Sequence, residues 1–229
     1  MPLPTPRAVL LDLDGTLVDT VETRIEAWLR TFDEFGIPAE RGFVAGLIGS
    51  DGKHLAREVA AAAAREVDDE LAEQIDHRAG EIYSELNIDP RPLPGVGELL
   101  DALEARGIPW AIATSSRRQQ VGRSVHALNR PHEPMIVDGS SVERAKPEPD
   151  LMLAAAAQLD VAPSDCWCVG DSTWDMRAAT AAGMTAIAVL AGSAVSADEL
   201  GAAAGATLCV ARMDELIAAL PASNAGARA

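Results

Sequence analysis

Two acidic residues near the amino terminus, Asp12 and Asp14, directly follow an apolar run at 8–11. The run predicts a short buried strand, and side chains two residues apart on an extended backbone point to the same side. Two carboxylates crowded at the end of a buried strand repel one another, and a cation between them relieves the repulsion. Oxygen ligands of this kind suit Mg²⁺. An isolated Asp pair is also compatible with two solvated side chains, so the rest of the chain must decide.

Three more polar groups follow apolar segments farther along the chain. Hydroxyl residues at 114–116 come after the first of these segments, Lys146 after the second, and Asp171 with Asp175 after the third. Parallel strands present their carboxyl ends at one edge of a sheet, and ligands bind at that edge. We therefore expect these groups to meet the first acidic pair at a single site.

Each member of this set has a use in phosphoryl transfer. An ionised carboxylate attacks phosphorus without an activating base, so Asp12 is the expected nucleophile and forms an acyl phosphate. We expect Asp14 to protonate the leaving oxygen and then to take a proton from water. Thr114 and the amides after it would hold phosphate oxygens at a helix start. Lys146 would face the same oxygens as a fixed charge.

The same arrangement predicts a metal site. The expected Mg²⁺ ligands are Asp12, Asp171 and the backbone carbonyl of Asp14, with Asp175 bound directly or through water. A divalent cation there would neutralise charge on the nucleophile and on the phosphate. Mg²⁺ is therefore the expected cofactor.

Substrate contacts are expected on two sides of this site. Gly15 and Ser115 lie beside the acidic pair and among the hydroxyl residues. The glycine-rich stretch at 49–54 predicts a loop that faces the site and selects the substrate. Lys53 and Arg57 are its candidate contacts, one helical turn apart. Either side chain is also compatible with a simple solvated charge.

The elements that would position these groups form two parts. From about residue 95 onward, apolar strands alternate with helices. Expected helices cover 95–106, 119–128, 149–159, 176–182 and 213–220, and expected strands cover 109–114, 135–137, 166–169, 185–190 and 207–210. This alternation predicts an α/β fold, a Rossmann-like parallel sheet with helices on both faces.

The residues from about 20 to 90 differ, because they show helical periodicity without a convincing strand. Three of the chain's eight aromatic residues, Trp28, Phe32 and Phe35, are spaced there as on one face of an amphipathic helix. A proline-rich return follows at 90–95. We therefore expect an all-helical cap at 20–90, inserted into an α/β catalytic core formed by 1–19 and 91–229.

Length, charge and cysteine content exclude several functional classes. The chain of 229 residues has a formal net charge of −16, which argues against non-specific nucleic-acid binding. Three cysteines are too few for a disulfide framework, and no apolar run is long enough to span a membrane. The first seven residues lack the apolar region of a signal peptide. A cytoplasmic protein without nucleic-acid or membrane partners is expected.

Taken together, these features resemble the haloacid dehalogenase superfamily, in the branch that carries a helical cap directly after the first motif, as in phosphoglycolate phosphatases and β-phosphoglucomutases. The four matching motifs are DLDGTLVDT (12–20), TSS (114–116), KPEPD (146–150) and VGDSTWD (169–175). Ala145 stands where family members commonly carry glycine. The dehalogenases and phosphonoacetaldehyde hydrolases of the family generally lack an acid at the position of Asp14. The resemblance therefore implies phosphate-ester hydrolysis or mutase chemistry.

The expected function is that of a Mg²⁺-dependent phosphatase acting on a small phosphorylated metabolite through an aspartyl phosphate. A sugar-phosphate mutase is the first alternative. A phosphonatase that uses Lys53 to form a Schiff base and a non-enzymatic phospho-accepting domain are further alternatives. The sequence leaves open the identity of the substrate and the choice between monomer and homodimer.

Overall fold

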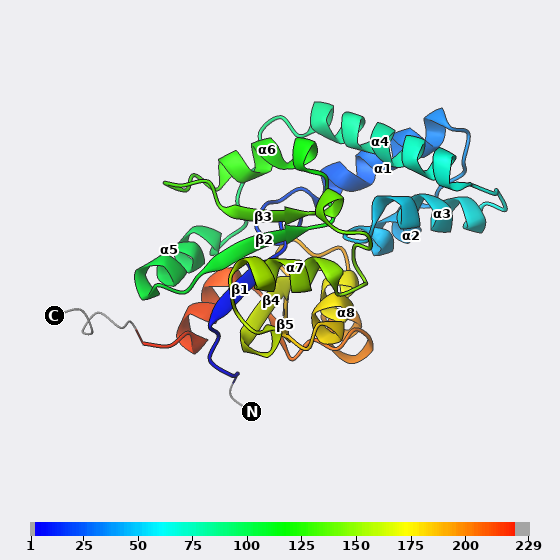
Figure 1. Ribbon diagram of the computed structural model, residues 1–229. Coiled ribbons are helices and arrows are strands. Elements are labelled where there is room, and N and C mark those ends of the chain that lie inside the picture. Colours follow the sequence, from blue (N-terminus) through cyan, green and yellow to red (C-terminus); the bar gives the residue numbers. More distant parts are fainter. Residues whose placement is uncertain (1–2, 223–229) are drawn as a thin grey trace.

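The computed structural model describes residues 3–222 and is built around a six-stranded, all-parallel sheet (Figure 1). In chain order the strands are β1 Ala8–Leu11, β2 Trp110–Thr114, β3 Met135–Asp138, β4 Cys166–Gly170, β5 Thr185–Val189 and β6 Leu208–Val210. Their order across the sheet is β3-β2-β1-β4-β5-β6. The order reverses at β1, so the crevice beyond its carboxyl end is where such a sheet binds ligands.

The central strand β1 is apolar at every position because both of its faces are covered. Val9 and Leu11 belong to the hydrophobic cluster on one face of the sheet, and Ala8 and Leu10 belong to the cluster on the other face. In the ladder, Leu10 is aligned with Cys168 of β4 on one side, and β2 pairs along the other side. A strand enclosed in this way cannot alternate apolar with polar residues.

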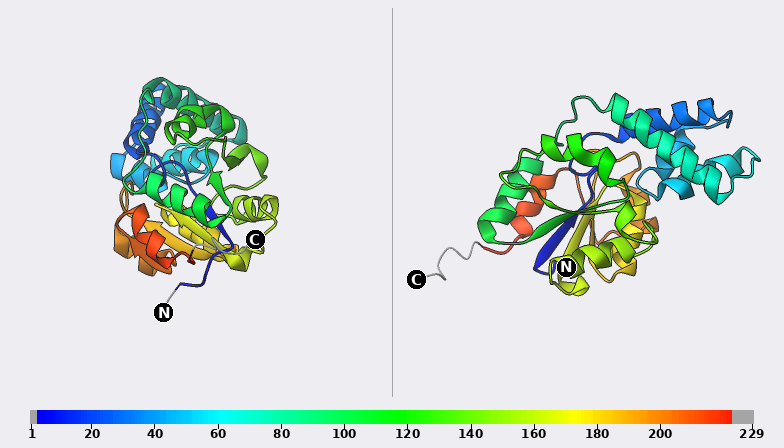
Figure 2. Two further views of the ribbon diagram at one scale, coloured as in Figure 1. Left: turned by 90° about the vertical axis from the view of Figure 1, so that its left-hand side faces the viewer. Right: turned by 45° about the horizontal axis from the view of Figure 1, so that its top comes forward.

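Helices cover both faces of the sheet (Figure 2). The longer ones are α5 Val96–Arg106, α6 Arg118–Ala127, α7 Asp150–Gln158 and α8 Thr173–Ala181; short 3₁₀ or π helices are η1 Gly139–Ser141, η2 Pro163–Asp165, η3 Glu199–Ala203 and η4 Met213–Ala219. Leu151 of α7 and Met176 of α8 pack in the cluster of Leu10, whereas Leu103 of α5 and Val121 of α6 pack on the opposite face. The expected Rossmann-like architecture is confirmed.

Two expected helices differ from the structure. The helix expected at 176–182 begins three residues earlier, at Thr173, because Ser172 and Asp175 cap it reciprocally. The Asp175 amide donates to the Ser172 hydroxyl at 3.2 Å, and the Ser172 amide donates to the Asp175 carboxylate at 3.1 Å. Asp175 therefore lies in the first turn of α8 rather than in a loop. The last expected helix, 213–220, is a 3₁₀ helix.

Four helices between β1 and α5 form a separate group with its own core (Figures 1 and 2). They are α1 Val21–Glu34, α2 Arg41–Leu47, α3 Gly52–Ala62 and α4 Asp69–Leu86. Their cluster contains Phe32, Val44, Leu55 and Ile75, one from each helix. Trp174 of α8 joins it and donates from its indole nitrogen to a carbonyl oxygen in α2 at 3.0 Å. The expected all-helical cap is confirmed.

The two chain segments that connect the cap to the sheet lie side by side. The Asp19 amide donates to the Arg91 carbonyl at 2.9 Å, and the Leu93 amide donates to the Leu17 carbonyl at 3.0 Å. This pairing supports our proposal that the cap begins after residue 19 and ends at residue 90. Among the helices within residues 3–222, none is both long and apolar enough to cross a bilayer.

Candidate active site

Three acidic side chains and one lysine meet beyond the carboxyl ends of β1 and β4; we call them the acidic cluster. Asp12 directly follows β1, Asp171 directly follows β4, and Asp175 comes from the first turn of α8. Lys146 comes from the loop before α7, and its ammonium lies 2.5 Å from Asp12 Oδ1 and 2.7 Å from Asp175 Oδ1. All four residues are buried, and one carboxylate oxygen from each acid lies within 4.8 Å of the others.

The acidic cluster carries more negative than positive charge, because three carboxylates face one ammonium. Burial raises the pKa of Asp12 to about 7; Lys146 opposes the rise and Asp175 adds to it. Burial and the two neighbouring carboxylates also raise the pKa of Asp171 well above its ordinary value. A hard divalent cation offsets this excess of charge, and buried carboxylate oxygens are the ligands it prefers. The residues present therefore fit a Mg²⁺ ion.

The loop after β1 is shaped around Asp171. Thr16 donates its hydroxyl proton to Asp171 Oδ1 at 2.7 Å. Gly15 has a φ of +82°, and a Cβ atom there would lie 2.3 Å from Asp171 Oδ2. Only glycine lets the backbone pass so close to this carboxylate. Gly15 does not line the cavity described below, so its contact with substrate stays a prediction.

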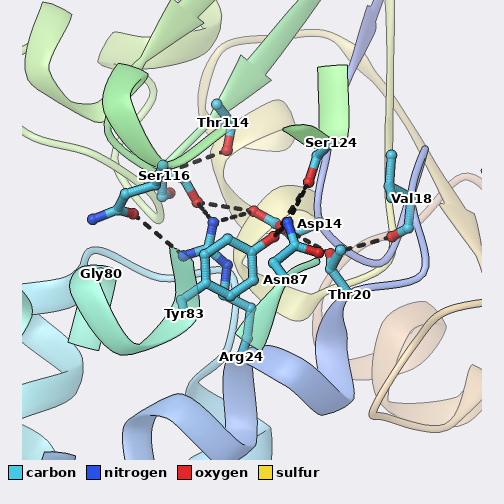
Figure 3. Close-up of polar contacts among 12 residues, drawn as sticks. Asp14, Val18, Thr20, Arg24, Gly80, Tyr83, Asn87, Thr114, Ser116 and Ser124 are labelled. Atoms are coloured by element: carbon cyan, nitrogen blue, oxygen red, sulfur yellow. Dashed lines mark hydrogen bonds and ion pairs between the residues drawn. The ribbon is translucent and has the colours of Figure 1, made fainter. Parts of the chain in front are cut away.

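Asp14 adjoins the acidic cluster, but its carboxylate is bound elsewhere, in what we call the Asp14 network (Figure 3). Thr20 and Tyr83 donate to Oδ1 at 2.7 and 2.9 Å, and Arg24 and Ser116 donate to Oδ2 at 2.8 and 2.9 Å. Burial by itself would raise the pKa of Asp14, but the Arg24 guanidinium and these hydrogen bonds hold it below its ordinary value. The Asp14 side chain is therefore a fully engaged carboxylate outside the metal-binding group.

Arg24 and Tyr83 are functional candidates that sequence reasoning missed. Both belong to the cap, and the Arg24 guanidinium carbon lies 3.3 Å from the centre of the Tyr83 ring. One signal was available, because Arg24 lies three residues after Val21 and four before Trp28. It therefore shares their apolar face of α1. A charge on such a face indicates that the helix covers something polar.

The hydroxyl residues at the end of β2 and directly after it line a cavity next to Asp12. Thr114 is buried and accepts a hydrogen bond from the Ser116 amide at 3.1 Å, while Ser115 donates to the Gly49 carbonyl of the cap at 3.0 Å. The residues that line this cavity come from both parts of the molecule: Asp12, Asp14, Arg24, Trp28, Ile48, Gly49, Ser50, Gly52, Leu55, Asp76, Thr114, Ser115, Ser116, Arg117 and Gln120. The cavity thus joins the expected nucleophile to the inner surface of the cap.

Lys53 and Arg57 lie outside this cavity. The Lys53 ammonium is 3.7 Å from a Glu73 carboxylate oxygen, and the Arg57 guanidinium is 2.5 Å from Asp69. They line a separate groove between α3 and the loop at 143–148. Their role as substrate contacts stays a prediction, whereas other residues of the glycine-rich stretch do line the cavity.

Comparison with known proteins places this geometry in a family. The pattern of the haloacid dehalogenase-like hydrolases matches residues 9–189. The chain is 33% identical to a β-phosphoglucomutase from Bacillus subtilis (strain 168) over 189 residues, 80% of this chain and 83% of that protein. It is 32% identical to a phosphoglycolate phosphatase from Nitrosospira multiformis over 193 residues, 80% of this chain and 82% of that protein.

A solved structure agrees with these relatives. The crystal structure of a hydrolase from Pseudomonas syringae superposes with a TM-score of 0.87 at 31% identity, covering 92% of this chain and 96% of that one. The family match and the likeness to this solved structure agree. This chain belongs to the haloacid dehalogenase-like hydrolases.

Proposed function

We propose that this protein is a Mg²⁺-dependent phosphatase that hydrolyses a small phosphorylated metabolite through an aspartyl phosphate on Asp12. The observation that carries the proposal is the acidic cluster, in which Asp12 lies beside Lys146 and lines the cavity under the cap. One of the relatives above is named as a phosphatase and the other as a mutase, and the family that matches is described as haloacid dehalogenase-like hydrolases.

Asp12 would act first, as the nucleophile. Its carboxylate attacks phosphorus, the bond from phosphorus to the ester oxygen breaks, and water then attacks the aspartyl phosphate to release inorganic phosphate. A bound Mg²⁺ would be held by Asp12, Asp171, Asp175 and the Asp14 backbone carbonyl, where it would offset the charge on nucleophile and phosphate. Burial of this cluster excludes bulk water from the reacting atoms.

Lys146, Thr114 and Ser115 would hold the phosphate oxygens. Burial by itself would lower the pKa of Lys146, but Asp12 and Asp175 raise it above its ordinary value, so the side chain stays an ammonium. Thr114 and Ser115 line the cavity at the end of β2, next to the Asp12 carboxylate. Fixed charge and hydroxyl groups at these positions suit the equatorial oxygens of a phosphoryl group.

Asp14 would transfer the protons: after taking a proton from solvent water it would give that proton to the leaving oxygen, and it would later take one from the attacking water. Its Oδ2 already accepts from Arg24 and Ser116, and its Oδ1 from Thr20 and Tyr83. A proton can reach or leave this carboxylate only after at least one of these donors moves away. The proposal therefore requires Asp14 to exchange hydrogen-bond partners during turnover.

The test is phosphate release from a panel of phosphorylated metabolites in the presence of Mg²⁺. Asp12→Asn should reduce kcat at least about a thousandfold on every substrate of the wild-type protein, because the amide cannot form the aspartyl phosphate. Asp33→Asn, an exposed change on α1, is the matched control and should leave kcat unaltered. Substantial turnover by Asp12→Asn with the wild-type Mg²⁺ dependence would disprove the nucleophile assignment.

A sugar-phosphate mutase is the second candidate, favoured by the likeness to the Bacillus subtilis enzyme of that name. A mutase returns the phosphoryl group to the substrate instead of to water. Incubation with a hexose 1-phosphate and Mg²⁺ distinguishes the two, because a mutase yields the isomer without free phosphate. A phosphonatase is not favoured, because Lys53 lies outside the cavity that Asp12 lines.

A further inference from the structure

We propose that the leaving group of the substrate is neutral and carries several hydroxyl groups, as in a sugar or polyol phosphate, and that Asp76 and Arg117 recognise those hydroxyls. The proposal rests on the function proposed above and adds to it the chemical class of the substrate. It also assigns specificity to two residues that belong to none of the four motifs.

Asp76 and Arg117 face each other across the junction of cap and core. Asp76 is on α4, and Arg117 directly precedes α6. Asp76 Oδ2 accepts from Arg117 Nε at 3.1 Å and from the terminal nitrogen of the same guanidinium at 2.7 Å; Glu73 lies 2.6 Å from that nitrogen. Both residues line the cavity with Asp12. The pair therefore forms part of the wall that meets whatever is attached to the phosphate.

Two glycines let the backbone lie directly against the polar groups of this wall. A Cβ atom at Gly52 would lie 1.9 Å from Asp76 Oδ1, and one at Gly80 would lie 2.0 Å from the Gln120 side-chain nitrogen. Within residues 3–222, no group donates a hydrogen bond to Asp76 Oδ1, although the side chain is only 16% exposed. An acceptor of this kind beside a cavity suits a hydroxyl donor from a ligand.

The charges of the cavity disfavour a second anionic group on the substrate. Both guanidinium groups in its lining are already paired, Arg24 with Asp14 and Arg117 with Asp76. The lining carboxylates, which also include Asp12, outnumber these two cations. A carboxylate or second phosphate would have to displace one of these partners, leaving a buried charge unpaired.

Hydroxyl groups fit the same wall without disturbing its charge balance. A hydroxyl donates to a carboxylate such as Asp76 and accepts from a guanidinium such as Arg117, so neighbouring hydroxyls can use both partners. Trp28, Ile48 and Leu55 complete the lining with apolar surface for the C–H faces of a carbohydrate. A ligand that lacks one of these hydroxyls leaves a polar group of the wall without its hydrogen-bond partner and therefore binds less tightly.

The same charge argument favours hydrolysis over the mutase reaction, in which the phosphoryl group returns to the substrate. A mutase breaks the bond between phosphorus and Asp12 while a second hydroxyl of an already phosphorylated sugar forms a new ester and gives up its proton to Asp14. The product at that stage carries two phosphates, one of them far from Asp12. No unpaired cation lines this cavity among the described residues, so water is the better acceptor.

The first experiment compares kcat/KM for sorbitol 6-phosphate, phosphoglycolate, fructose 1,6-bisphosphate and p-nitrophenyl phosphate, using the full chain with Mg²⁺. Sorbitol 6-phosphate should exceed phosphoglycolate and the bisphosphate by about tenfold or more. A preference for either of the two anionic leaving groups would overturn the substrate class. Turnover of p-nitrophenyl phosphate alone would also overturn it while leaving the phosphatase function standing. Turnover of none would refute the phosphatase function itself.

The second experiment changes the wall and follows the ratio of kcat/KM for sorbitol 6-phosphate to that for p-nitrophenyl phosphate. Asp76→Ala should lower the ratio about tenfold or more, because the aryl ester offers no hydroxyl to lose. Gly52→Ala places a methyl group against Asp76 Oδ1 and should also lower the ratio. This variant tests the same contact if Asp76→Ala does not fold. Glu85→Ala, exposed on the same helix, should keep the ratio. An unchanged ratio in the folded variants would remove Asp76 from recognition.

Discussion

The acidic cluster and the Asp14 network are neighbouring groups of buried charge with opposite electrostatics. In the acidic cluster one lysine faces three carboxylates, and the pKa of Asp12 is raised to about 7. In the Asp14 network one carboxylate has four donors, and the pKa of Asp14 is lowered. Negative charge is left in excess where we propose that a cation and a phosphate bind, and it is balanced where the cap meets the core.

The two groups also differ in where their members come from. The acidic cluster is built entirely from the core, on two strand ends, the loop before α7 and the start of α8. The Asp14 network adds Arg24 and Tyr83 from the cap to Ser116 from the core. Within the rigid core, the acidic cluster can remain short of positive charge until a ligand binds. The junction between cap and core, in contrast, is stable only when its buried polar groups have hydrogen-bond partners.

The largest expected effect is that of Lys146→Met, which leaves three buried carboxylates without a cation. We expect the metal-free protein to lose about 3–5 kcal/mol of unfolding free energy, with loss of activity. Urea denaturation in EDTA measures the first and phosphate release the second. Arg7→Met removes an exposed pair with Asp165 and should change neither. A Lys146→Met protein as stable as the wild type would show that Lys146 does not offset the charge of the buried carboxylates.

The next prediction concerns pH. Because the folded-state pKa of Asp12 is raised from 3.8 to about 7, the folded protein retains a proton that the unfolded chain releases. The unfolding free energy of the metal-free protein should therefore fall as pH rises through this interval. Urea titrations in EDTA at pH 5 and pH 7.5 measure the fall, and Asp12→Asn should reduce it. An identical slope in that variant would contradict the assignment.

Arg24→Met should have a smaller effect than Lys146→Met, because Asp14 keeps three other donors. We expect a loss of about 2–3 kcal/mol at neutral pH. The sign of the pH dependence is opposite to that of Asp12: a lowered pKa stabilises the fold above 3.8 and that contribution disappears at lower pH. Arg30→Met, exposed on the same helix, is the control. Equal denaturation midpoints for the two variants would show that the Asp14 network does not hold the cap.

Tyr83→Phe should have the smallest effect, about 1 kcal/mol, since Thr20 still donates to Asp14 Oδ1. Thermal unfolding of the variant and of the wild type gives the difference. The ring remains beside Arg24, so the loss isolates one hydroxyl. A loss as large as that of Arg24→Met would mean that the hydroxyl, and not the ion pair, dominates the network.

The structure brought together most of the site that the sequence predicted, and the reason lies in local periodicity. Each of Asp12, Thr114 and Asp171 ends or directly follows an apolar strand, and parallel strands end at one edge whatever their order. The same reasoning predicts that Lys146 reaches the site, because it follows the apolar segment at 135–137. The start of α8 was missed because the cap formed by Ser172 and Asp175 is a side-chain effect that apolar spacing does not record.

The sequence by itself determined the sheet, the inserted helices and the acids that meet at the strand ends, because these follow from periodicity along the chain. Only the tertiary structure decided which partner each charge has. Arg24 reaches Ser116 across 92 positions, and Arg117 reaches Asp76 across 41. Lys53 forms an ion pair with Glu73 and does not line the cavity. The Arg24 and Arg117 pairings depend on how the cap sits on the core, and a contact between two distant parts of the chain leaves no period in the sequence.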